Sequence, residues 1–405
     1  MADFELIKSL ARKTDTKIVL LVMDGLGGIP HPKTLRTELE DAQTDNLDRL
    51  ARASQTGLSI PVAHGITPGS GPGHLALFGY DPIKYLIGRG ILEALGLDMD
   101  VRDGDVAARG NFCTIGEDGT ITDRRAGRIS TDINRELAQR LNDIKLDNAR
   151  PIVASGREHR LAIIFRPEDG GPQLSDALTD SDPQREGLAP LEVTSSEILG
   201  QNTADIVNSF LKVAMSVIAD AHPANGLVLR GFATIPNLPQ MSDVYALNPA
   251  AIAAYPMYRG LAKLVGMNVI QTGDTIDQQI ETARENWNAH DFFFIHYKYT
   301  DSTGEDGDYD AKVAAIEQLD QALPALLDLD PDVLIVAGDH STPSAMAAHS
   351  WHPVPVMIRS RHIAAGFSEG FTERECAKGM LGTMAATDII PLALANAGKL
   401  DKFGA

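Results

Sequence analysis

Four short segments of the chain concentrate carboxylate, imidazole and hydroxyl groups. Three of them follow apolar runs of strand length, and the fourth is a glycine-rich turn that contains one serine. The side chains concerned are Asp24, Ser70, Asp301, Asp339, His340 and His349. Mixed nitrogen and oxygen donors suit divalent cations. Two cations about 3.5–4 Å apart lower the pKa of a hydroxyl and clamp a phosphate during in-line displacement, so the combination predicts a two-metal site with a serine nucleophile.

Each segment taken alone also fits a structural role. Asp24 fits a solvated turn, the serine segment fits a Gly/Pro-rich connection without chemistry, and residues 300–308 fit a solvated acidic loop. The serine segment Thr67-Pro-Gly-Ser70-Gly-Pro-Gly-His74 is neither a P-loop nor a G-x-S-x-G elbow. A helical pattern over 74–78 places Ser70 at a helix N-terminus, where free N–H groups favour a phosphoryl group.

Apolar runs predict the strands that position these groups. Runs at 17–22, 291–296, 332–337 and 354–358 are typical of strands buried on both faces, and helical patterns cover 274–288 and 310–327. Strand alternating with helix favours an α/β fold with parallel strands. Ligands bind such sheets beyond the carboxyl ends of the strands, where we expect the metal-binding side chains to meet.

The middle of the chain has a different pattern and predicts an inserted α+β domain at about 101–250. A hairpin is expected from 111–115 and 120–122, and further strands at 160–165 and 226–230. A loop rich in Asp, Gly and Pro covers 167–188, and an amphipathic helix is expected at about 204–219. The core would then be formed by residues 1–100 and 251–405.

Composition excludes several function classes. The 405 residues carry a formal net charge of -19, which disfavours nucleic-acid binding and docking on anionic lipid, since both depend on Lys and Arg. The two cysteines make neither a disulfide framework nor a cysteine zinc site. No signal-peptide pattern and no apolar stretch of about 18 residues is present, so we expect a cytoplasmic protein.

The motifs together resemble the alkaline phosphatase superfamily. The matching motifs are Asp24-Gly25, Ser70-x-x-Gly-His74, Asp301, Gly338-Asp339-His340-Ser-Thr-Pro343 and His349-Ser-x-x-Pro-Val-Pro355. They are most similar to the cofactor-independent phosphoglycerate mutases of the archaeal type, as are Gly79-Tyr-Asp-Pro82, Asp123-Arg-Arg-Ala-Gly-Arg128 and Leu229-Arg-Gly231. The resemblance implies an α/β alkaline-phosphatase-like core, with a mostly parallel sheet and helices on both faces, plus the inserted domain that binds substrate.

The same resemblance implies a reaction and its cofactors. Ser70 would take the phosphoryl group from 3-phosphoglycerate, and the 2-hydroxyl of bound glycerate would recover it as 2-phosphoglycerate. The residues implied for one divalent cation are Asp24, Ser70, Asp339 and His340, and those for the other are Asp301 and His349. Mn²⁺ or Mg²⁺ is expected, and Zn²⁺ or Co²⁺ would also fit.

Glu305 departs from the family pattern, which usually reads Asp-x-x-x-His at this segment. A carboxylate in place of imidazole hardens the site in favour of Mg²⁺ or Mn²⁺. We expect Glu305 to be a metal ligand. The alternatives are a weakened site or replacement by Asp306.

Arginines are expected to bind the phosphate and carboxylate of the substrate. With Ser70, Asp123 and Arg125 are the predicted catalytic residues. The predicted substrate-binding residues are Arg124, Arg128, His159, Arg160, Arg230, Arg259 and Lys298, with Arg157 in a weaker cluster beside His159. Any single arginine also fits a surface ion pair.

Two other functions remain open from the sequence. On the same core, water could accept the phosphoryl group, which would make the protein a metal-dependent phosphomonoester or phosphonate hydrolase. A metal-binding relic that has lost activity is the non-enzymatic alternative. An inserted domain with several arginines favours the mutase, because a mutase has to hold glycerate and exclude water. The oligomeric state is left open.

Overall fold

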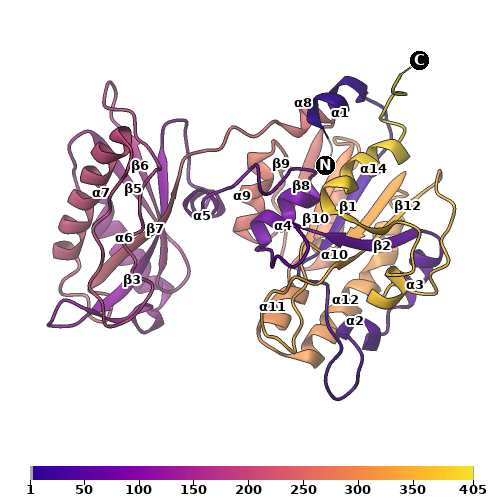
Figure 1. The fold of residues 1–405 in the computed structure, drawn as a ribbon, viewed down its shortest axis with the longest axis horizontal. Helices are drawn as coiled ribbons and strands as arrows, with labels where there is room; N and C mark the ends of the chain where they lie inside the picture. The colour runs from indigo at the N-terminus through magenta and orange to yellow at the C-terminus, as the bar shows by residue number, and fades with distance from the viewer. Residues whose placement is uncertain (1–2, 405) are drawn as a thin grey trace. The chain divides into compact units, whose positions relative to one another are not determined.

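The computed structural model describes residues 3–404 and divides them into two compact units. The core unit contains the described residues up to Leu86 and those from Leu238 onward, and the inserted unit is Ile87–Asn237 (Figure 1). These boundaries precede the expected ones at 101 and 250. The first boundary lies earlier than expected because α5 (Arg89–Gly96) packs on the inserted sheet. The packing is close, since a Cβ on Gly90 would lie 2.2 Å from a backbone oxygen of β3. Residues 1, 2 and 405 of the expected core lie outside the described residues.

The core unit is built around one large sheet. Its strands are β1 (Ile18–Met23), β2 (Gln55–Ile60), β8 (Pro249–Ile252), β9 (Asn268–Val269), β10 (Phe292–Tyr297), β11 (Val333–Ala337), β12 (Val354–Ser360) and β13 (Gly382–Ala385). Their order across the sheet is β13-β2-β12-β11-β1-β10-β8-β9. β1 pairs in parallel with β10 and β11, whereas β12 runs antiparallel to β11 and β2. The α/β fold with a mostly parallel sheet is confirmed, but the direction of β12 differs from the parallel strand expected.

Helices cover both faces of this sheet. They are α1 (Phe4–Leu10), α2 (Glu38–Asp41), α3 (Asp45–Arg52), α4 (Ser70–Leu77), α8 (Met241–Val244), α9 (Pro256–Leu264), α10 (Ile276–Glu285), α11 (Tyr299–Glu305), α12 (Tyr309–Leu327), α13 (Glu373–Cys376), the 3₁₀ turn η2 (Ala386–Asp388) and α14 (Ile389–Asn396). α3, α10 and α12 bury apolar side chains against one face. On the other face Phe78, just after α4, contacts Phe294 of β10 edge-on at 4.9 Å. Among residues 3–404 no helix is both long and apolar enough to cross a membrane.

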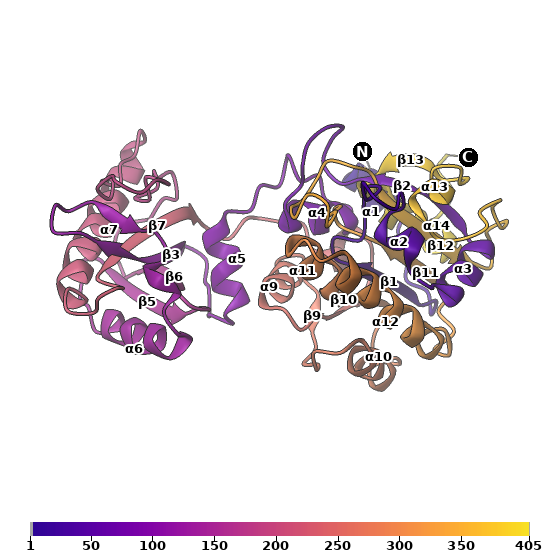
Figure 2. The ribbon, with the colours of Figure 1, turned by 90° about the horizontal axis from the view of Figure 1, so that it is seen from below.

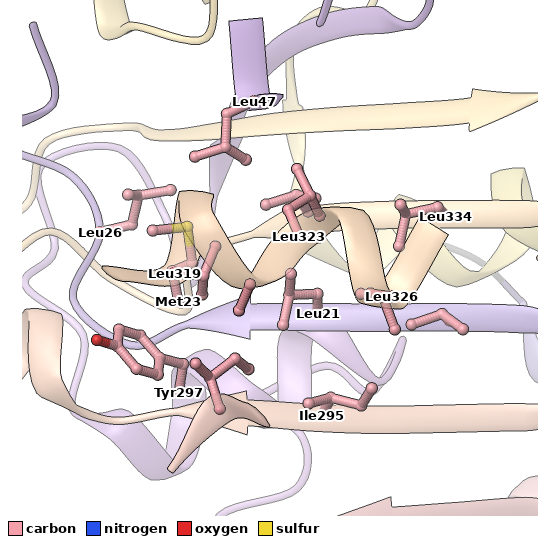
Figure 3. Close-up of a cluster of buried hydrophobic side chains, with 14 of the residues drawn as sticks. Leu21, Met23, Leu26, Leu47, Ile295, Tyr297, Leu319, Leu323, Leu326 and Leu334 are labelled. Atoms are coloured by element: carbon pink, nitrogen blue, oxygen red, sulfur yellow. The ribbon is translucent and has the colours of Figure 1, made fainter. Parts of the chain in front are cut away.

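The apolar core fixes the strand that ends at the candidate site. Successive side chains of a strand point to opposite faces, and Leu21 and Met23 of β1 both enter the cluster under α12. Figure 3 shows Leu21 near Leu323 and Leu326 of that helix, and Met23 beside Leu319. These side chains are at most 1% exposed, so β1 is held along its length up to Asp24.

The inserted unit has its own sheet and core (Figure 2). Besides α5, its elements are β3 (Val106–Ile115), β4 (Ile121–Asp123), the 3₁₀ turn η1 (Ala126–Arg128), α6 (Thr131–Asn142), β5 (Ala149–Ser155), β6 (Arg160–Pro167), α7 (Ile198–Val217) and β7 (Gly226–Ala233). β3 pairs antiparallel with β4, β6 and β7, which confirms the expected hairpin. α7 begins at Ile198, earlier than the expected start near 204. Val106, Ala108 and Phe112 of β3 face α6 and α7, which leaves Arg109 and Asn111 on the opposite face.

Candidate active site

The ends of three adjacent strands bring the expected ligands to one edge of the core sheet. Asp24 follows β1, Asp301 lies on α11 just after β10, and Asp339 follows β11. Because these strands are parallel neighbours, their carboxyl ends lie at the same edge. His349 reaches this edge from the opposite direction, because it precedes the antiparallel β12.

Ser70 is the first residue of α4, which therefore begins earlier than the expected helix at 74–78. Its Oγ lies 3.1 Å from Nε2 of His340. A Cβ on Gly73 would lie 2.3 Å from the backbone oxygen of Asp339, so the missing side chain lets α4 approach the end of β11 closely. Gly69 offers no side chain to cap the helix, which leaves amide groups of the first turn for an anion.

A first ligand group consists of Asp24, Asp339 and His340. All three side chains are fully buried, and their ligand atoms lie within 4.8 Å of one another. Nε2 of His340 is 3.3 Å from Oδ1 of Asp24 and 3.2 Å from Oδ2 of Asp339. Among the described residues Oδ1 of Asp24 has no hydrogen-bond partner. A buried carboxylate oxygen without a hydrogen bond fits a divalent cation, since burying a polar atom unsatisfied is costly.

A second group forms around His349. His349, Asp301 and His340 have ligand atoms within 4.8 Å of one another, and the two imidazole rings stack at 3.7 Å. Nε2 of His349 is 3.6 Å from Oδ1 of Asp301 and 3.4 Å from Oε1 of Glu305. Glu305 and the half-buried His349 bond each other, and this bond helps raise the pKa of His349 to about 9 although burial lowers it.

Glu305 reaches this group from a helix. The expected loop at 300–308 is α11 up to Glu305, because the segment folds onto the core instead of remaining in solvent. Asp301 and Glu305 are four residues apart and so lie on one face of α11. Within residues 3–404 the carboxylates paired with His349 are those of Asp301 and Glu305, and Asp306 is exposed at the helix end.

Lys298 links one carboxylate of the first group, Asp24, to one of the second, Asp301. Its Nζ donates to Oδ2 of Asp24 at 3.1 Å and to Oδ2 of Asp301 at shorter range, and it also donates to the Tyr258 hydroxyl at 2.9 Å. Burial acts to raise the pKa of Asp24. The Lys298 ammonium and the imidazoles of His296 and His340 outweigh it, so the pKa of that carboxyl lies well below its usual value. Lys298, expected to bind substrate, therefore compensates the ligand carboxylates in this structure.

Two further histidines orient the ligands, and neither was among the predicted site residues. Nε2 of His296 bonds Oδ2 of Asp24 at 3.0 Å, and its ring stacks on Tyr258 at 3.7 Å. Nδ1 of His74 lies 2.9 Å from the Ser70 carbonyl oxygen and 3.0 Å from Oδ2 of Asp339. Partners of this kind fix the orientation of a metal ligand.

In the inserted unit, arginines gather around a cavity of about 220 Å³ on the sheet face opposite α6 and α7. The residues lining it are Arg109, Asn111, Arg124, Arg125, Arg128, Glu158, His159, Arg160 and Arg230. Burial and the Arg160 guanidinium lower the pKa of His159 to about 4. The cavity is therefore strongly cationic although the chain as a whole is acidic, as a phosphate or carboxylate ligand requires.

Two aspartates hold arginines of this cavity in place. The carboxylate of Asp123 accepts the backbone N–H groups of Arg125 and Gly127, each at 2.7 Å. Asp182 lies 2.7 Å from Nη2 of Arg124 and 3.6 Å from Arg230. These contacts give Asp123 a positioning role, whereas its catalytic role stays a prediction.

Comparisons with known proteins bear on the family of the chain. The model of the metalloenzyme superfamily matches residues 16–396. A probable 2,3-bisphosphoglycerate-independent phosphoglycerate mutase of Aquifex aeolicus is 51% identical over 408 residues, covering 99% of this chain and 100% of that protein. A protein of the same description from Thermus thermophilus is 47% identical, with 99% of each chain covered. The chain belongs to the family of 2,3-bisphosphoglycerate-independent phosphoglycerate mutases.

Solved structures support the same family. The cofactor-independent phosphoglycerate mutase of Thermoplasma acidophilum is 33% identical, with a TM-score of 0.74 over 95% of this chain and 100% of that one. The PH0037 protein of Pyrococcus horikoshii has a TM-score of 0.82 and is 28% identical, covering 97% and 100%. The family resemblance seen in the motifs is confirmed, and membership of a metalloenzyme superfamily implies divalent metal use.

Not every residue predicted from the mutase motifs lies at one of the two clusters. Arg157 is exposed and does not line the arginine cavity. Arg259 lies partly exposed on α9, beside Tyr258 in sequence, and its substrate contact stays a prediction. Arg109 and Asn111 line the cavity but were not predicted. A lone charged residue inside the apolar strand at 106–115 is the signal that could have indicated Arg109.

Proposed function

We propose that this protein interconverts 3-phosphoglycerate and 2-phosphoglycerate without 2,3-bisphosphoglycerate, through a phosphoserine at Ser70. The observation that carries the proposal is the position of Ser70, whose Oγ lies 3.1 Å from His340 among buried carboxylates at the sheet edge. A serine placed in this way can accept a phosphoryl group and return it. The substrate class follows from relatives of about half identity over nearly their full length, which are named as such mutases.

The reaction has two phosphoryl transfers, the first to Ser70 and the second from Ser70 back to glycerate. Oγ of Ser70 attacks the phosphorus of 3-phosphoglycerate, the bond from phosphorus to the 3-oxygen breaks, and the serine proton ends on that oxygen. The 2-hydroxyl of glycerate then attacks the phosphoserine, and Ser70 is released as a free hydroxyl. Amide groups at the start of α4 stabilise the phosphoryl oxygens.

Two divalent cations fit the ligand groups of the core unit. Asp24, Ser70, Asp339 and His340 would hold one cation, and Asp301, Glu305 and His349 the other. When bound, the cations lower the pKa of the serine hydroxyl and neutralise charge on the transferring group. Glu305, the second oxygen donor of the Asp301–Glu305–His349 group, favours Mn²⁺ or Mg²⁺ over the softer Zn²⁺ or Co²⁺.

The arginine cavity of the inserted unit would bind the substrate anion. Arg124, Arg125 and Arg128 come from one turn whose backbone Asp123 holds, and Asp182 holds the guanidinium of Arg124. The turn and that guanidinium are therefore set before a ligand binds. Bidentate contacts of arginine suit both the carboxylate and the phosphate of phosphoglycerate. Holding glycerate between the two steps is what separates a mutase from a hydrolase. The cytoplasmic location stays a prediction.

The test incubates the purified full-length protein with 3-phosphoglycerate and Mn²⁺, in the absence of 2,3-bisphosphoglycerate. We expect 2-phosphoglycerate to form with little release of inorganic phosphate. Release of phosphate without 2-phosphoglycerate would instead identify a hydrolase. No turnover with either Mn²⁺ or Mg²⁺ would support the inactive metal-binding alternative.

A further inference from the structure

A fully buried lysine lies beneath the ligand loops and is not part of the metal site. Lys312 of α12 is 0% exposed. Its Nζ donates to the backbone oxygens of Thr342 at 2.7 Å, Gly25 at 2.9 Å and Gly27 at 3.3 Å. An ammonium group has three N–H donors, so each finds a carbonyl oxygen. A neutral amine has only two donors, so the geometry calls for the charged form.

The three carbonyl groups belong to the two loops that carry most of the ligands. Gly25 directly follows Asp24, and Thr342 comes two residues after His340. The loops also bond each other, since the N–H of Thr342 donates to the oxygens of Gly25 and Gly27 at 3.2 and 3.0 Å. Lys312 therefore ties the end of β1 to the end of β11.

The same loop residues position the ligand side chains. The N–H of Gly25 donates to Oδ1 of Asp339 at 3.1 Å. The hydroxyl of Thr342 donates to Oδ1 of Asp301 at 2.6 Å and lies 2.9 Å from Nδ1 of His340. A shift of the loop after β11 would therefore disturb side chains of both ligand groups, and a shift of the loop after β1 would disturb Asp24 and Asp339.

Two carboxylates outside the metal site, those of Glu38 and Glu373, act on the charge of Lys312. Burial lowers the pKa of Lys312, and the carboxylates of Glu38 and Glu373 act against that shift. Glu38 is 1% exposed, and its Oε1 accepts the N–H of Ser344 at 2.8 Å. Burying two opposite charges is rarely the most stable solution, because apolar side chains of the same volume often do as well or better. Stability alone therefore does not explain why Lys312 and Glu38 are buried as charged groups.

We propose that Lys312 is a positioning residue, whose ammonium acts as a fixed internal cation that sets the loops after β1 and β11 for divalent metal binding. It would hold Asp24, His340 and Asp301 in place before any metal arrives. The inference rests on the proposed function for the existence of the metal centre, but concerns a residue that touches neither metal nor substrate.

The main test compares Lys312→Met/Glu38→Gln with Glu38→Gln alone, in the full-length protein freed of metal. The double variant removes the charges of Lys312 and Glu38, so no uncompensated carboxylate is left at Glu38. Titration calorimetry with Mn²⁺ should give ~10–100-fold weaker binding for the double variant, the range found when support of metal ligands is lost. Glu38→Gln should bind Mn²⁺ about as tightly as the unsubstituted protein.

Hydrogen exchange in the metal-free proteins gives an independent readout. Peptides that cover residues 24–28 and 341–344 should exchange faster in the double variant than in Glu38→Gln, whereas β10 should be unchanged. Equal Mn²⁺ affinity and equal exchange in the two variants would overturn the proposal.

A rescue experiment tests whether the ammonium charge itself is required. Lys312→Ala leaves room for a small alkylammonium ion, so ethylammonium chloride should restore Mn²⁺ affinity, and sodium chloride at equal ionic strength should not. Loss of affinity without rescue would mean a packing role only and would contradict the proposal. If the original protein binds Mn²⁺ but forms no 2-phosphoglycerate, the proposed function fails while the role of Lys312 can still be measured.

Discussion

Gly73 offers the sharpest test of the idea that Ser70 works through its position. A Cβ at residue 73 would lie 2.3 Å from the backbone oxygen of Asp339, whereas ordinary contacts begin at 3.4 Å. Gly73→Ala therefore requires α4 and the end of β11 to separate by about 1 Å. Ser70 lies on one side of this contact and the Asp339–His340 pair on the other. The shift therefore moves the Ser70 hydroxyl away from His340.

The expected effect falls on catalysis more than on stability. A misplacement of about 1 Å costs roughly 10²-fold in rate. Alanine favours a helix over glycine by about 1 kcal/mol, which offsets part of the ~1–3 kcal/mol of overpacking. We therefore expect kcat for conversion of 3-phosphoglycerate to fall about 100-fold. KM should change less, because the arginine cavity belongs to the inserted unit.

Gly69→Ala is the matched control, because a Cβ there would meet only Pro72 at 3.8 Å. Its backbone, with φ -85° and ψ 164°, suits alanine. Both variants are assayed by steady-state kinetics with Mn²⁺ and by thermal unfolding. A kcat of Gly73→Ala equal to that of Gly69→Ala would refute the geometric argument.

Three further predictions concern the second ligand group and the arginine cavity. Glu305→Ala should lower the Mn²⁺ content of the purified protein, because one carboxylate next to His349 is lost, whereas Asp306→Ala should not; the reverse result in metal analysis would make Asp306 the ligand. The pKa of His159, about 4, lies below the ordinary value of about 6.5, so the unfolded chain binds more protons between these values. Stability of the inserted unit should be fully present above about pH 6.5 and fall as the pH drops toward 4. Thermal unfolding across this range should show a flatter dependence for His159→Gln, and equal slopes would contradict the assignment. Arg125→Met should raise KM for 3-phosphoglycerate about 10–100-fold through a lost charged hydrogen bond. Arg157→Met, outside the cavity, should leave KM unchanged. Similar KM values for the two variants would contradict substrate binding in the arginine cavity.

Much of the core fold could be predicted because its central strands are buried on both faces. The runs at 17–22, 291–296 and 332–337 contain almost no polar residues, and they form β1, β10 and β11. The direction of β12 could not be predicted in this way, because pairing depends on contacts distant in sequence. The start of α4 was missed because a segment rich in glycine and proline has low helix propensity, which packing against the end of β11 overrides.

The gathering of the candidate metal ligands was predictable because carboxylates and histidines at strand ends have few purely structural explanations when several coincide. The residues that orient them were not. His296 lies in a run of phenylalanines and is indistinguishable there from a core histidine, and its partner Asp24 is far away in sequence. The role of Lys312 could not be predicted either, since a lysine on a helix is ordinarily at the surface. Such roles become visible only once the loops after β1 and β11 are placed side by side.

The central claim is that the phosphoryl group passes through Ser70. Acid quenching of the protein during turnover of 3-phosphoglycerate, followed by peptide mapping with mass spectrometry, tests it directly. We predict one phosphoryl group on the peptide that contains Ser70, and neither label nor turnover in Ser70→Ala. A phosphoryl group on a different residue, or 2-phosphoglycerate formed by Ser70→Ala, would contradict the account.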